Sequence, residues 1–95
     1  MQIDANQQPA VVTDVDDLRR LEVLAPADLP DADLAARLGQ LGRLDGDHVR
    51  LSVAHLRQAG PADAGWAQGF DGMIAYAGSK GWVEGDAVRA HVVRT

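Results

Sequence analysis

One stretch of the chain decides how the rest is arranged: GPADAGWAQGFDGMIAYAGSKG, residues 60–81. Pro61 suits the first position of a helix, Asp63 suits the positive end of its dipole, and Gly81 suits the position just past its C-terminus. One side of this helix collects the large apolar residues within an arc of about 100°: Trp66, Phe70, Met73, Ile74 and Ala77. The stretch predicts a helix over 62–79 with this apolar side buried in the core.

A second side of the same helix carries glycine. Gly65, Gly69 and Gly72 are spaced at helical intervals on one stripe, and Tyr76 continues the stripe by another turn. Each interior glycine costs a helix roughly 0.5–1 kcal/mol relative to alanine, so close approach of another backbone is the usual reason for such a stripe. Two occupants are open: a helix over 32–41 in the same domain, or a second subunit or protein partner.

The elements before this helix are a leucine-bearing helix and an ambiguous segment. Asp31 is expected to cap a helix over 32–41, in which three leucines share one side. Residues 48–59 fit one continuous helix, which the spacing of their apolar residues favours. They also fit a strand over 48–51, followed by Ser52 as the cap of a helix at 53–59. Both interpretations of 48–52 stay open.

The C-terminal part indicates strands. Gly85 lies in a predicted turn, and Val88, Ala90 and Val92 point to one side of the strand that follows. A strand near 18–24 is a candidate to pair with this hairpin. The fold class is therefore α+β: three helices with a small antiparallel sheet built around a C-terminal β-hairpin. Residues 1–10 are polar and predict a flexible N-terminal tail, with 11–95 as a single small globular domain.

Composition excludes several classes of function. The chain has no cysteine, so disulfides and thiolate metal sites are absent. No apolar run approaches the ~18 residues of a membrane span, and the first ten residues lack the pattern of a secretory signal, so we expect a cytoplasmic protein without a membrane partner. The net charge of −5 disfavours nonspecific binding to nucleic acid.

Few residues suggest chemistry. His48, His55 and His91 match no metal-binding spacing, no motif for a cofactor is present, and neither Ser52 nor Ser79 has a visible base partner. Arg89 and His91 share one face of the last strand, which is either a solvated polar face or an anion-binding site with Arg89 as clamp and His91 as proton donor.

Three functions follow from these patterns. The first hypothesis is a non-enzymatic interaction or accessory module that forms a homodimer, or binds a protein partner, through Gly65, Gly69, Gly72 and Tyr76. The second is a winged-helix-like DNA-binding regulator, which the acids Asp63 and Asp71 on the would-be reading helix disfavour. The third is a small enzyme or ligand-binding protein with an anion site at Arg89 and His91.

Overall fold

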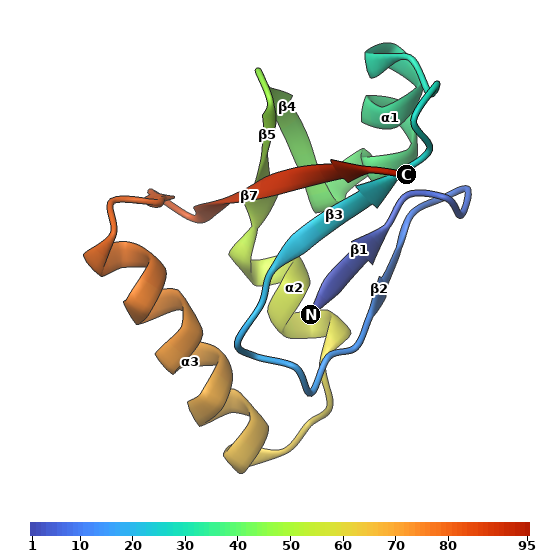
Figure 1. The fold of residues 1–95 in the computed structure, drawn as a ribbon. Helices are drawn as coiled ribbons and strands as arrows, with labels where there is room; N and C mark the ends of the chain where they lie inside the picture. The colour runs from blue at the N-terminus through green and yellow to red at the C-terminus, as the bar shows by residue number, and fades with distance from the viewer.

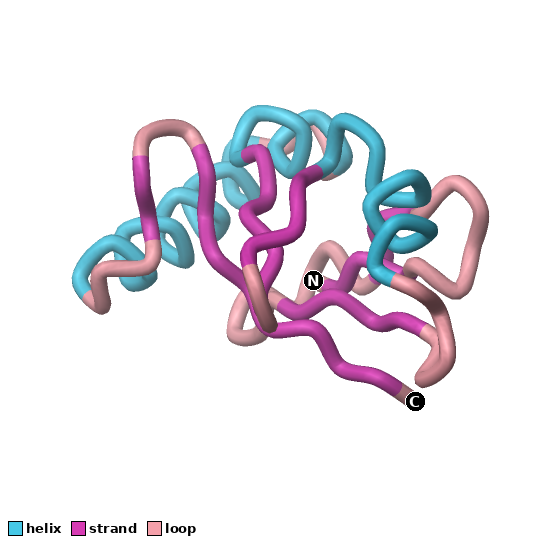
Figure 2. The backbone as a smooth tube through the Cα atoms, turned by 90° about the horizontal axis from the view of Figure 1, so that it is seen from above, coloured by secondary structure: helices cyan, strands magenta, loops and turns pink.

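The computed structural model describes residues 1–95 and shows a twisted sheet with helices gathered along one side (Figures 1 and 2). The elements in chain order are β1 (Gln2–Asp4), β2 (Val11–Thr13), β3 (Glu22–Ala25), α1 (Asp31–Leu38), a short 3₁₀ helix (Gly39–Leu41), β4 (Gly42–Asp45), β5 (His48–Ser52), α2 (Val53–Ala59), α3 (Ala64–Ser79), β6 (Val83–Glu84) and β7 (Ala87–Arg94). The predicted α+β class is confirmed. None of the helices is both long and apolar enough to cross a bilayer.

The sheet is larger than the sequence predicts, and it is mixed rather than antiparallel. Its seven strands follow the order β2-β1-β3-β7-β5-β4, and β6 also pairs with β7. β3 is parallel to both β1 and β7, whereas the other pairs are antiparallel. Parallel neighbours need long crossover connections, so their pairing joins residues far apart in the chain and leaves no local signature in the sequence.

The predicted flexible tail over residues 1–10 is instead part of the sheet. β1 lies between β2 and β3, and the side chains of Met1, Ile3 and Ala5 are completely buried. These apolar residues alternate with Gln2 and Asp4, which is the period of a half-buried strand. The alternation covers only five residues before a polar turn, so the composition of the whole segment outweighed it in the prediction.

The segment 48–59 is a strand followed by a helix. Val49 and Leu51 are buried on one face of β5, which is hydrogen-bonded to β4 on one edge and to β7 on the other. The Ser52 side chain accepts the backbone N–H of His55 and caps α2. The continuous-helix interpretation over 48–59 is therefore wrong, because sheet pairing on both edges outweighs the helical spacing of three apolar residues.

The predicted core face of α3 is confirmed. Asp63, rather than the residue before Pro61, is the N-cap, and its side chain accepts the N–H of Trp66 at 2.9 Å. The rings of Trp66 and Phe70 stack with centroids 5.1 Å apart, and Trp66 Nε1 donates to the Val15 carbonyl at 2.8 Å. A buried indole thus satisfies its only donor while holding α3 against the segment between β2 and β3.

The position of β1 in the sheet predicts that Ile3→Ala destabilises the protein severely. Truncating a fully buried isoleucine to alanine costs about 2–5 kcal/mol of stability, because less apolar surface is removed from water on folding and a cavity is left in the core. Urea denaturation followed by far-ultraviolet circular dichroism measures the loss. Val11→Ala, at an exposed position of β2, is the control. Equally small losses of stability in the two variants would mean that β1 is not part of the sheet.

Replacement of glycine by alanine is expected to have opposite effects on stability at two positions, Gly72 and Gly60. A Cβ at Gly72 of α3 would meet no atom within 4 Å, so Gly72→Ala is expected to raise the free energy of unfolding by roughly 0.5–1 kcal/mol through helix propensity. A Cβ at Gly60 would lie 2.1 Å from the Trp66 ring, so Gly60→Ala is expected to lower it by displacing the indole. Denaturation midpoints of the two variants test both signs; stabilisation by Gly60→Ala would contradict the packing around Trp66.

Candidate functional site

A pocket of about 220 Å³ opens where one edge of β7 changes partners. Its first edge pairs with β5 over Ala87–His91. Along the other edge, β6 pairs with Ala87 and Val88, and β3 pairs from His91 onwards. β3 and β6 therefore separate beside Arg89 and Ala90, and the separation forms the pocket.

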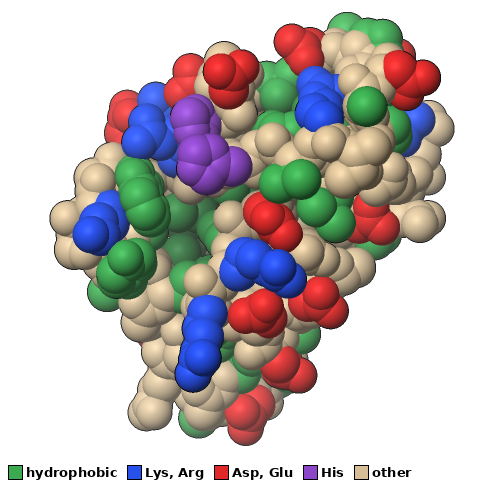
Figure 3. Space-filling view, viewed as in Figure 1, with side chains coloured by type: hydrophobic (Ala, Val, Ile, Leu, Met, Phe, Trp, Pro, Cys, Tyr) green, Lys and Arg blue, Asp and Glu red, His purple; other side chains and the backbone are tan.

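Twelve residues line the pocket: Arg19, Arg20, Leu21, His48, Met73, Tyr76, Ala77, Trp82, Val88, Arg89, Ala90 and His91. Five of these are arginine or histidine, seven are hydrophobic, and none is acidic. Figure 3 shows histidine and basic side chains around a hollow with hydrophobic side chains in its depth. The three arginines, Arg19, Arg20 and Arg89, are exposed to solvent at the rim of the hollow.

Two pairs of identical basic residues lie side by side on β5 and β7. His48 is paired with His91, with ring centroids 4.6 Å apart, and Arg50 is paired with Arg89. Like charges directly opposite each other destabilise a sheet. The structure offsets this cost for Arg50 but shows no such compensation for Arg89.

Arg50 is neutralised by two acids. Its guanidinium donates to Asp45 at 2.8 Å and to Glu84 at 2.5 Å. The two hydrogen bonds that Arg50 donates lower the pKa of both carboxyl groups, and the same two bonds raise the pKa of Arg50. Both acids are thereby engaged by Arg50, whereas the Arg89 side chain makes no ion pair or hydrogen bond.

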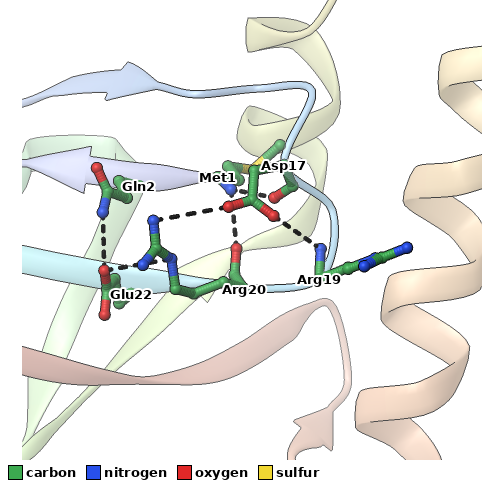
Figure 4. Close-up of polar contacts among 6 residues, drawn as sticks. All are labelled: Met1, Gln2, Asp17, Arg19, Arg20 and Glu22. Carbon is green, nitrogen blue, oxygen red and sulfur yellow. Dashed lines mark hydrogen bonds and ion pairs between the residues drawn. The ribbon is translucent and has the colours of Figure 1, made fainter.

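On the opposite wall of the pocket, Arg20 is ion-paired whereas Arg19 is not (Figure 4). Arg20 lies 3.6 Å from the carboxylates of both Asp17 and Glu22. This cluster also holds the Met1 amino group, which donates to the backbone carbonyls of Asp17 and Arg20. The Arg19 side chain points away from the cluster toward α3 and has no partner. Three of the eight arginines lack an ion pair or side-chain hydrogen bond: Arg19, Arg43 and Arg89. Of these, Arg19 and Arg89 line the pocket.

The structure brings Arg89 and His91, the residues of the expected anion site, into one pocket with apolar walls. It adds four charged or aromatic residues that sequence patterns did not nominate: Arg19, Arg20, His48 and Trp82. Arg19 and Arg20 reach the pocket only because β3 is parallel to β7, and no local pattern reveals that pairing. His48 could have been found from its cross-strand position, had 48–52 been assigned as a strand.

The glycine stripe of α3 is only partly covered. A Cβ at Gly69 would lie 2.7 Å from Leu18 Cδ1, so the segment before β3, and not the helix over 32–41, occupies that position. Gly72 has no neighbour within 4 Å, and at Gly65 the nearest atom belongs to the capping side chain of Asp63. Tyr76 is 59% exposed; its ring meets Trp82 edge to face at 6.3 Å, which places Tyr76 in the wall of the pocket.

Ser52 has a base partner that the sequence analysis did not identify. Its Oγ lies 2.8 Å from His55 Nδ1, and His55 Nε2 lies 3.3 Å from the Gln40 side-chain oxygen. Because Ser52 Oγ also accepts the His55 backbone N–H as the N-cap of α2, the two side chains are held together at the start of that helix. This geometry explains the contact without any catalytic role, and His55 is not among the pocket residues.

No three histidine or acidic side chains are grouped closely enough to hold a metal ion. Comparisons of this chain with protein-family models, curated proteins and solved structures find no match.

Proposed function

We propose that this protein is a small binding module that holds an anionic ligand in the pocket beside β7. The observation that carries the proposal is the pair of unpartnered guanidinium groups, Arg19 and Arg89, which face one apolar hollow together with His48 and His91. No acidic side chain lines that hollow. An anion would supply the missing counter-charge.

The physical basis is charge-assisted hydrogen bonding. A guanidinium group offers a planar fork of donors that matches a carboxylate or a phosphate, and such bonds are about twice as strong as neutral ones. A bound anion would also relieve the repulsion between Arg50 and Arg89, which lie directly opposite each other. The basic side chains form a compact cluster and not a stripe along a helix, so a small anion fits them better than a duplex nucleic acid.

Binding explains the lining better than catalysis does. The pocket has imidazole and guanidinium groups, but it contains neither a serine or threonine hydroxyl nor a carboxylate. His91 could act as a proton donor to a bound anion, yet no second group completes an acid–base pair of different types. An accessory protein that senses or carries a small anion accounts for the same residues.

Acetate and inorganic phosphate, titrated at low ionic strength, provide the test. We expect millimolar affinity, with chemical-shift changes in ¹⁵N spectra confined to amides near Arg89 and Ala90 and to the Trp82 indole. Arg89→Gln is expected to weaken binding on the order of tenfold, the effect of losing one charge-assisted hydrogen bond. Arg43→Gln is the matched control, because Arg43 is also unpaired but lies outside this pocket. The proposal would be contradicted if neither anion caused chemical-shift changes. It would also be contradicted if Arg89→Gln and Arg43→Gln lost the same amount of binding affinity.

A second candidate function is self-association through α3. It is favoured by the open space at Gly72 and by the exposure of Tyr76 on the same side of the helix. Tyrosine is enriched in protein interfaces. The two functions are compatible, since Tyr76 borders both the pocket and the glycine stripe.

Light scattering at micromolar concentration tests this candidate. The expected result is a dimer that Gly72→Leu converts to monomer by filling the space between the helices. Gly78→Leu is the control, because Gly78 is also open but lies off the stripe. A wild-type protein that remains monomeric would remove the homodimer from consideration.

A further inference from the structure

The anion pocket has an apolar interior that an inorganic anion would leave empty. Leu21, Met73, Ala77 and Val88 contribute to it, from the chain before β3, from α3 and from β7. Ala77 and Val88 are themselves buried, so this part of the wall belongs to the core and is fixed in place. A ligand that carries only charge would contact the cations and leave water against the apolar wall, which is unfavourable.

One wall of the pocket is aromatic. Tyr76 and Trp82 meet edge to face, and Trp82 is 39% exposed although it is among the largest apolar side chains of the protein. Lys80 lies over the Tyr76 ring, with its ammonium 5.5 Å from the ring centre. A planar ring entering the pocket could pack against this wall in the offset or edge-to-face geometry that aromatic groups prefer.

The size of the pocket limits the ligand to about one ring. Drug-sized ligands occupy pockets of roughly 300–1,000 Å³, whereas a cavity of roughly 150 Å³ accommodates benzene. At about 220 Å³, this pocket lies between these two cases. It has room for one six-membered ring and a short acidic substituent.

We infer that the ligand is a single-ring aryl anion, a carboxylate or a phosphate ester, whose charged group lies against Arg89 and Arg19 and whose ring lies against Tyr76 and Trp82. This inference rests on the proposed function, because it specifies which anions the same pocket prefers. The ring uses the apolar interior, and the charged group supplies the counter-charge that the arginines lack.

Titration calorimetry with four probes tests the inference: phenylacetate, phenyl phosphate, acetate and inorganic phosphate. Burial of the ring is expected to make at least one aryl anion bind about tenfold or more tightly than its ringless counterpart. Neutral 2-phenylacetamide is expected to bind no more tightly than acetate. The preferred aryl anion identifies the charged group as carboxylate or phosphate.

Two variants separate the parts of the site. Tyr76→Ala, at an exposed position that should not affect folding, is expected to lower the affinity for the aryl anion several-fold and to leave the affinity for acetate or phosphate unchanged. Arg89→Gln is expected to lower the affinity for aryl and ringless anions alike. Matching urea midpoints for both variants and the wild type confirm that the fold is intact.

The possible failures are distinguishable. If neither aryl anion binds more tightly than its ringless counterpart, the inference about the ring is overturned while the anion pocket stands. If 2-phenylacetamide binds as tightly as phenylacetate, the pocket selects the ring and not the charge, which contradicts both proposals. If none of the probes binds, both proposals fall together.

Discussion

Strand β7 is the element on which the structure depends, because three other strands hydrogen-bond to it. β5 pairs with its first five residues on one edge, while β6 and β3 divide the other edge between them. β6 is antiparallel to β7 and β3 is parallel, so they reach the shared edge from different directions. Their registers leave Arg89 and Ala90 between the two paired stretches of this edge, and the pocket lies there.

Helix α3 turns this gap in the sheet into a pocket. Trp66 and Phe70 anchor its first half in the core, and Trp66 is hydrogen-bonded to the Val15 carbonyl. The second half contributes Met73, Tyr76 and Ala77 to the pocket wall. The same helix therefore stabilises the fold at one end and shapes the candidate site at the other.

The distribution of charge connects the fold to the proposed function. Most arginines are committed to structural contacts; Arg94, for example, binds Asp31 and the carbonyls of Pro26 and Leu29 in the connection from β3 to α1. Arg19 and Arg89 have no such commitment, although acids outnumber bases in the chain by fourteen to nine. The proposed function takes these two arginines, which are free of ion pairs and line one pocket, as the groups that hold a ligand.

Patterns that depend on neighbours along the chain were predictable from the sequence, and patterns that depend on distant pairing were not. Helix α3 and its core face follow from apolar spacing, although Pro61 lies before the helix and not at its first position, and strand alternation indicates the shared face of Arg89 and His91. The alternation in β1 is too short to predict a strand, and the apolar spacing in 48–59 favours a helix because the sheet partners of β5 are not visible in the sequence. The same limitation hid Arg19, which joins Arg89 only through the parallel β3–β7 pairing.

The most direct test of this account is the crystal structure of the protein in complex with phenylacetate. We predict that the ligand lies at the separation of β3 and β6, with its carboxylate within hydrogen-bonding distance of Arg89 or Arg19 and its ring against Tyr76. A structure in which the pocket is empty, and both arginines instead form ion pairs with acids of the protein, would contradict the account.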